Sequence, residues 1–287
     1  MAGALIRFDM SLSHYFTYPP APGVDTRPLI PRKEERQLYM RGEFGCKADG
    51  QPRPISAHST THLDVPYHFI ASQADVAGVL NNRDFVGDRP CLARVVALGG
   101  KEDVPGVFTR DGVTYCEAVS AQVLPNAGEL RNYETLVILT GFGELMERQQ
   151  GVPFTPAPDG PFHIPYLDQS AVDVILASGV GMVAIDSNSV ESQTSVDPLR
   201  MSSESHFRLL GNEPPVLILE CLGAGGMKEQ VGFVPREGLF HMVPRRVNER
   251  GAEAAHGRAF LYFYRDDPQG EALRKLADVM TAEELHG

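Results

Sequence analysis

Three of the nine histidines of this chain lie within eleven residues, in the run HSTTHLDVPYH at positions 58–68. Imidazole and carboxylate groups are the ligands that borderline divalent metals prefer where no thiolate is offered. The run contains four side chains of these two types: His58, His62, Asp64 and His68. Their types and their close spacing predict a metal site.

The spacing also predicts the local structure that carries this site. All four positions are even-numbered, so in an extended strand their side chains project to one face. A helix would place His58 and His62 together but leave Asp64 off that face. Pro66 disfavours the helix as well, because it pushes Val65 toward extended geometry. We therefore expect a strand.

His68 differs from the other three positions because it follows Pro66, where we expect the chain to turn. It can therefore stand off the metal and act as a general acid or base, a role suited to an imidazole whose pKa lies near neutrality. The alternative for the whole run is a set of hydrogen-bonded structural residues. Burying the four groups together without a cation would leave polar atoms that need partners and imidazoles that repel when protonated, which favours the metal.

The composition of the chain excludes several classes of binding partner and indicates where in the cell the protein works. The formal net charge is -11 and the pI about 5.3, which argues against nucleic acid or an anionic membrane as the main partner. No apolar run approaches the roughly 18 residues of a spanning helix, and the first residues lack the apolar core of a signal peptide. The four cysteines show no CxxC spacing, which disfavours a disulfide framework or a thiolate zinc site. We expect a cytoplasmic protein with a small-molecule substrate.

Helices and strands alternate in the second half of the chain. This alternation predicts one α/β domain over residues 1–287, with a mixed central sheet or barrel-like core flanked by helices. The surface loops rich in Gly and Pro are expected at 99–114 and 150–165. Short apolar runs predict strands at 4–10, 92–98, 136–140, 180–186, 216–220 and 259–264, and helical spacing predicts helices at 168–177, 204–210 and 271–280.

The histidine run resembles the HxGTHxDxPxHF signature of the cyclase-like metal hydrolases. That family includes bacterial kynurenine formamidase, isatin hydrolase and several cyclases. Three further stretches are similar to landmarks of the family: FDMSLSHYF at 8–16, IDSNSVESQTSVDP at 185–198 and ILECL at 218–222. The resemblance covers residues 8–222 and leaves 223–287 as a less familiar C-terminal extension.

The resemblance implies a swivelling β/β/α-like fold and a division of labour within the site. It implies that His58, His62 and Asp64 bind metal, and that His68 is the acid/base. His206, on the predicted helix 204–210, and Glu220, at the end of the predicted strand 216–220, would complete a site for one or two ions. The ligand set suits zinc and manganese alike. Family members are commonly homodimers or homotetramers.

Two departures from the family pattern bear on substrate binding. Thr60 stands where the signature has glycine, which places a β-branched side chain where the family backbone is bare. The formamidase's early tryptophan is missing, and Tyr18 or Phe16 stands in its place. We therefore expect Tyr18, Thr60 and Phe69, which closes the signature, to border the substrate.

The function expected from these residues is hydrolysis of a small amide, cyclic amide or lactone by metal-activated water. One alternative is a metal-dependent cyclase or dehydrating enzyme, which would close a ring with the same site. A second alternative is a metal-binding or ligand-binding protein without catalysis, whose metal would have no open coordination position.

Overall fold

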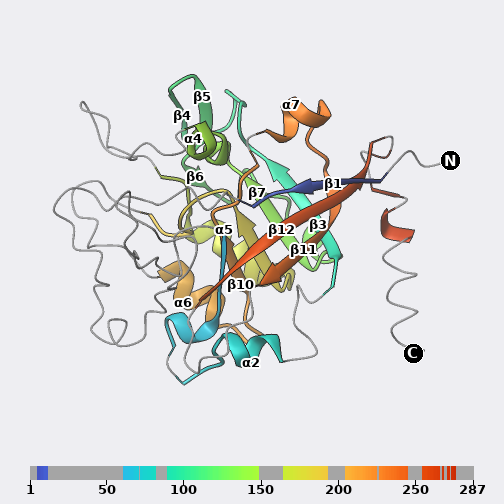
Figure 1. The fold of residues 1–287 in the computed structure, drawn as a ribbon. Helices are drawn as coiled ribbons and strands as arrows, with labels where there is room; N and C mark the ends of the chain where they lie inside the picture. Colours follow the sequence, from blue (N-terminus) through green and yellow to red (C-terminus); the bar gives the residue numbers. More distant parts are fainter. Residues whose placement is uncertain are drawn as a thin grey trace, which may run out of the picture.

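Eight strands form one sheet in a computed structural model that describes residues 5–11, 61–70, 72–81, 89–148, 164–192, 204–224, 226–244, 254–265, 267, 270–271 and 273–275 (Figure 1). The parallel pairs are β3–β7, β7–β9 and β9–β10, and the remaining pairs are antiparallel. In sheet order, the strands are β1 (Leu5–Asp9), β12 (Ala254–Tyr264), β11 (Glu237–Pro244), β3 (Cys91–Ala97), β7 (Thr135–Leu139), β9 (Met182–Ile185), β10 (Leu217–Glu220) and β2 (His62–Asp64).

The sheet closes on itself through β2. This strand pairs with β10 on one side and with β12 on the other. All strands of the sheet except β1 therefore form a closed ring of seven. β1 lies outside the ring, against the far end of the long β12 (Figure 1). The expected mixed α/β fold with a barrel-like core is thereby confirmed.

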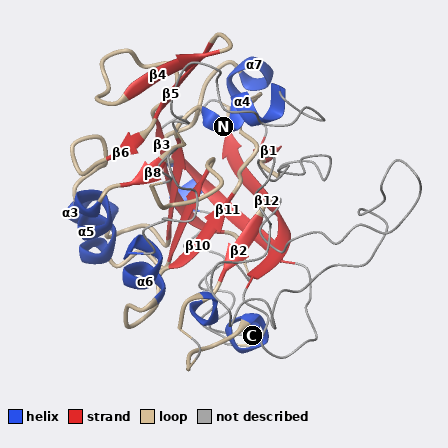
Figure 2. Ribbon diagram, turned by 90° about the vertical axis from the view of Figure 1, so that its left-hand side faces the viewer, coloured by secondary structure: helices blue, strands red, loops and turns tan. Residues whose placement is uncertain are grey.

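Side chains alternate between the inside of the ring and its outer face, as the two-residue period of a strand requires. On β7, Val137 and Leu139 belong to the apolar cluster that fills the ring, whereas Leu136 and Ile138 belong to a second cluster outside it. The second cluster packs beneath α5 (Gln169–Ser178) and α6 (Glu204–Leu210). Figure 2 shows these helices and α3 (Ala127–Leu130) together on one side of the strands.

Local sequence signals explain where α5 begins and ends. The carboxylate of Asp168 accepts a hydrogen bond from the backbone N–H of Ala171, which caps the helix N-terminus. Gly179 ends the helix in the left-handed conformation, at a φ of 79°. The remaining described helices are α2 (Val76–Leu80), α4 (Phe142–Arg148) and α7 (Met227–Val231), with a 3₁₀ turn at Pro66–His68. No helix in these described segments is long and apolar enough to cross a bilayer.

The region 99–114, expected as a surface loop, contains most of a β-hairpin instead. Its strands are β4 (Val107–Arg110) and β5 (Val113–Cys116), joined at Asp111 and Gly112, whose φ angles are 50° and 74°. An Asp-Gly pair between two runs rich in β-branched and aromatic residues is a strong hairpin signal, because both positions accept a positive φ. The signal was therefore present in the sequence. A second small sheet joins β6 (Ala118–Val119) to β8 (Tyr166–Leu167).

Two strands of the ring, β11 and β12, lie in the 223–287 segment that the family resemblance leaves out. Leu273, in the segment 271–280 where a helix was expected, is buried in the cluster that fills the ring. This end of the chain therefore supplies part of the barrel wall.

Candidate metal centre

The strand β2 carries two of the predicted ligands, His62 and Asp64, on one face. It is shorter than expected: it ends at Asp64, and Pro66 opens the 3₁₀ turn that carries His68. The Nε2 atom of His62 lies 3.5 Å from Oδ1 of Asp64, and both side chains are fully buried. His58, Thr60 and Tyr18 lie outside the described residues.

Glu220 and His206 converge on this strand from two other elements. Glu220, the last residue of β10, stands directly opposite His62 in the antiparallel register, with its Oε2 3.4 Å from Nε2 of His62. His206 projects from α6, and its Nε2 lies 3.3 Å from Oε1 of Glu220. These residues, 14 positions apart in sequence, meet because α6 packs against β10 on the outer face of the ring.

The two carboxylates each lie between the two imidazoles. Asp64 turns Oδ1 toward His62 and Oδ2 toward His206, the latter at 3.5 Å. Glu220 does the same with Oε2 and Oε1. All four side chains are at least nine-tenths buried. The arrangement brings nitrogen and oxygen donors from three elements into one small volume.

His68 lies at the His206 side of this group. Donor atoms of Asp64, His68 and His206 lie within 4.8 Å of one another, as do those of His62, Asp64 and Glu220. The two sets share Asp64. The ring of Phe69 packs edge-on against His68, with centroids 4.3 Å apart, and lies 4.6 Å from the ring of His206. Phe69 thus forms an apolar border between the two imidazoles.

The charges of the group influence one another strongly. Burial by itself lowers the pKa of His206, but hydrogen bonds to the carboxylates of Asp64, Glu191 and Glu220 outweigh it and hold this pKa well above its usual value. Burial and the charge of Asp64 raise the pKa of Glu220, yet its hydrogen bonds to His206 and His62 bring that pKa below its usual value. Glu220 is therefore ionised at neutral pH.

Glu191 is a site residue that the sequence analysis did not single out. Its Oε1 accepts hydrogen bonds from the backbone N–H of His206 at 2.8 Å and from the ring Nδ1 at 3.1 Å. One position earlier, the backbone N–H of Val190 donates to Oε1 of Glu220 at 2.8 Å. The loop after β9 therefore orients one imidazole and one carboxylate. The only signal in the sequence was its place within 185–198.

Another buried carboxylate, that of Asp186 at the start of this loop, connects the ends of the neighbouring strands β7 and β9. It accepts four hydrogen bonds: from the N–H and the Oγ1 hydroxyl of Thr140, and from the N–H groups of Gly141 and Gly143. Burial raises the pKa of Asp186, and the four donors act in the opposite direction. Gly143 approaches so closely that an added Cβ would stand 2.8 Å from the carbonyl oxygen of Leu222, so only glycine fits there.

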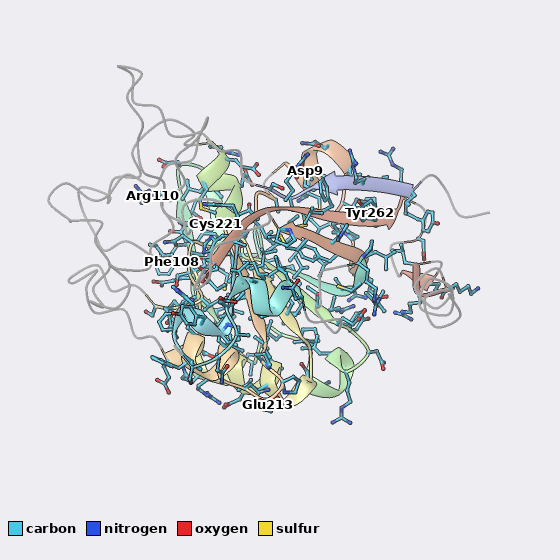
Figure 3. All side chains as sticks on the ribbon, turned by 60° about the horizontal axis from the view of Figure 1, so that its bottom comes forward. Asp9, Phe108, Arg110, Glu213, Cys221 and Tyr262 are labelled. Atoms are coloured by element: carbon cyan, nitrogen blue, oxygen red, sulfur yellow. The ribbon has the colours of Figure 1, made fainter. Side chains whose placement is uncertain are left out.

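A hydrogen bond between segments far apart in the sequence holds the end of β10. The hydroxyl of Thr61, one residue before His62, donates to the carbonyl oxygen of Cys221 at 2.7 Å. Cys221 has a φ of 60°, so the chain turns sharply just after Glu220. Figure 3 shows Cys221 among the packed side chains of the interior, whereas Glu213 and Arg110 lie at the periphery. The bond ties together β2 and β10, the two strands that carry candidate ligands.

The donor set fits a divalent cation. Two imidazoles and two carboxylates, buried and within a few ångströms of one another, are the nitrogen and oxygen ligands of zinc and manganese sites. Glu191 accepts a hydrogen bond from Nδ1 of His206, and Nε2 of the same ring therefore faces Asp64 and Glu220. Metal-binding histidines are oriented in this way by a carboxylate behind them.

A model of the family described as "Putative cyclase" matches residues 10–192, which are 183 of the 287 residues of the chain. The chain belongs to this cyclase family. The match includes the run from His62 to His68 and Glu191, and it ends before His206 and Glu220. A search of the curated proteins finds no match.

Solved structures resemble this cyclase-family chain over most of its length. A potential metal-dependent hydrolase with cyclase activity is 15% identical, over 90% of this chain and 98% of that chain, with a TM-score of 0.51. A novel cyclase is 14% identical, over 91% and 89%, with a TM-score of 0.50. These two share its fold. An isatin hydrolase bound to a product analogue, thioisatinate, is 16% identical, over 91% and 93%, with a TM-score of 0.48.

Proposed function

We propose that this cyclase-family protein is a metal-dependent hydrolase that cleaves a small amide, cyclic amide or lactone. The observation that carries the proposal is the placement of Asp64 and Glu220 between the imidazoles of His62 and His206, with a third imidazole, that of His68, at their side. The family match and the description of one solved structure as a potential metal-dependent hydrolase support it.

A zinc or manganese ion bound by these ligands would polarise a substrate carbonyl and lower the pKa of water toward neutrality. The chain's own residues hold and orient that site. His62, Asp64, His206 and Glu220 supply the donor atoms, and His58 joins them by resemblance to the family. These ligands would hold one ion or two between them.

His68 is the proposed proton carrier. Its side chain is buried but retains 8% exposure, so it borders the group without being sealed within it. The imidazole would take a proton from the attacking water and return it to the leaving nitrogen or oxygen. Phe69 packs on the ring and limits its freedom, which favours one orientation toward the substrate. Phe69, Thr60 and Tyr18 are the proposed substrate contacts.

Metal analysis of the purified protein, followed by a hydrolysis screen, tests this proposal. We expect zinc or manganese in the protein, turnover of at least one among aryl formamides, cyclic imides and small lactones, and loss of that turnover after chelation. Restoring the metal should restore the turnover. Protein that hydrolysed none of these compounds when loaded with either metal would contradict the proposal.

The family name favours a second candidate, a cyclase that closes a ring at the same site. Isotopically labelled water separates the two, because only net hydrolysis places the label in the product. A binding protein without catalysis is the remaining alternative. It would show a metal whose coordination is complete, with no water exchanging at the ion.

A further inference from the structure

One large apolar side chain remains exposed beside the metal centre. Phe207 follows the candidate ligand His206 on α6, and it is 47% exposed. Its ring packs edge-on against that of Phe69, with centroids 5.2 Å apart. Phe69 in turn lies against the imidazoles of His68 and His206. A continuous row of rings therefore leads from the surface to the proposed proton carrier and to one ligand.

The metal centre is least enclosed on the side of this row. The four candidate ligands that the structure describes are each at most 3% exposed, whereas His68 is 8% exposed and Phe69 is only partly buried. A substrate that reaches the ligands therefore approaches past His68 and Phe69. Phe207 borders this approach, because its ring touches the ring of Phe69.

The helix face around Phe207 is otherwise polar. Glu204 and Arg208 lie on the same face of α6, and Arg208 donates hydrogen bonds to Gln169 and Asp173. Surfaces that bind other proteins present larger contiguous apolar patches, whereas a small molecule needs only a few apolar side chains with polar groups nearby. The apolar surface formed by Phe207 and Phe69 matches a small molecule better than a protein.

We propose that Phe207 is a specificity residue, which together with Phe69 contacts an aromatic ring of the substrate beside the bond that is cleaved. Aromatic rings favour edge-on or offset contacts with centroids about 4.5–7 Å apart. A substrate ring packed on the exposed side of Phe207 would make such a contact and remove apolar surface from water. An aliphatic substrate with the same scissile group would gain less. The inference rests on the proposed function and narrows its substrates to compounds that carry an aromatic ring.

Two hydroxamates that differ in one ring test the proposal by binding alone. Benzohydroxamate and acetohydroxamate chelate a metal through the same group, and only the first carries a phenyl ring. Calorimetric titration of zinc-loaded wild type should show about 10-fold tighter binding of benzohydroxamate, the equivalent of one aromatic contact. Phe207→Ala should abolish this preference and leave the affinity for acetohydroxamate as it is. Leu5→Ala, on β1, removes an apolar side chain of similar exposure and should keep both affinities.

Turnover provides a second readout with a matched pair of substrates. Phthalimide and succinimide share the cyclic imide group, and only phthalimide is aromatic. We expect Phe207→Ala to lower kcat/KM for phthalimide about 10-fold, mainly through KM, because the lost contact is made in the ground state as well as in the transition state. The value for succinimide should stay unchanged.

Each other outcome overturns a stated claim. Equal affinities of the two hydroxamates in the wild type, or a preference that persists in Phe207→Ala, would overturn the aromatic contact. Weaker binding of both hydroxamates in Phe207→Ala would assign the residue to the support of His206 instead, and a smaller assembly in size-exclusion chromatography would assign it to a contact between copies of the chain. Phe207→Gln provides the same comparison if the alanine variant does not fold.

The inference and the proposed function fail in different ways. A wild type that preferred benzohydroxamate through Phe207 but hydrolysed no compound of the screen would overturn the proposed function and leave the aromatic contact standing. A wild type that hydrolysed succinimide and phthalimide with equal kcat/KM in the presence and absence of the Phe207 ring would do the reverse. Protein that bound neither zinc nor manganese would overturn both.

Discussion

One carboxylate oxygen of Glu191 accepts hydrogen bonds from both the backbone N–H and the ring Nδ1 of His206. The first bond is donated by the N–H of His206, which lies in the first turn of α6, two residues after Glu204. The N–H groups of a first helical turn have no partners within the helix. The second bond fixes which nitrogen of the ring faces the other carboxylates. Glu191 thus anchors the helix and its histidine at once.

Glu191→Ala should therefore weaken metal binding about 10–100-fold, because the imidazole loses its orientation. Glu191→Gln should lose less, since one amide oxygen can accept both hydrogen bonds. Competition with a chelator of known affinity measures the change. Glu129→Ala, in the capping box of α3, is the control and should leave metal affinity as it is. An unaltered affinity in Glu191→Ala would show that the helix alone positions His206.

The proposed roles of His68 and Asp64 predict different effects on metal content and turnover when each residue is replaced. His68→Ala should keep its metal and lose about 10²–10⁴-fold in turnover, because only the proton carrier is removed. Asp64→Ala should lose metal and turnover together, since Asp64 faces both imidazoles. Metal content and kcat, measured on the same preparations, distinguish the roles. Near-normal turnover in His68→Ala would rule out the acid/base role.

Asp186→Asn should destabilise the fold by about 2–4 kcal/mol, since an amide nitrogen would face N–H or O–H donors in either orientation. Denaturant unfolding of the metal-free protein measures this loss. Asp173→Asn provides the comparison: that side chain is exposed on α5, and its change should stay within about 0.5 kcal/mol. A loss below about 1 kcal/mol at Asp186 would mean that the four donors find other partners.

Three cysteines should resist alkylation in the native protein. Burial raises the pKa of Cys91 to about 12 and that of Cys116 to about 11, and it raises the pKa of Cys221 as well. A group with a raised pKa stays protonated as the pH rises past its unfolded value of about 8.5, and only the thiolate reacts. At pH 8, iodoacetamide should label these three only after denaturation, as read by peptide mass mapping. Rapid native labelling of Cys91 would contradict its burial.

Much of the barrel was predictable because its buried strands are short apolar runs with clear ends. The strands expected at 92–98, 136–140 and 216–220 match β3, β7 and β10 within one residue at each end, and the helix at 168–177 matches α5 equally well. The extended conformation of Val65, with a φ of -116° and a ψ of 161°, was expected from its place before Pro66. These features depend on local sequence alone.

The features that the sequence did not reveal depend on long-range pairing. The antiparallel pairing of β2 with β12 joins residues almost 200 positions apart, and no local pattern records it. Glu191 is a single acidic residue in a loop, without periodicity or a motif of its own. Its role depends on where α6 docks, so only the folded arrangement reveals it.

The closure of the ring has a consequence for how the protein is made. The strand that carries His62 and Asp64 is seated between β10 and β12, and β12 ends at Tyr264. A chain emerging from the ribosome exposes the histidine run early, but β2 cannot take its place between β10 and β12 until β12 has been synthesised. An ion at the proposed site would therefore bind only after β12 has joined the ring.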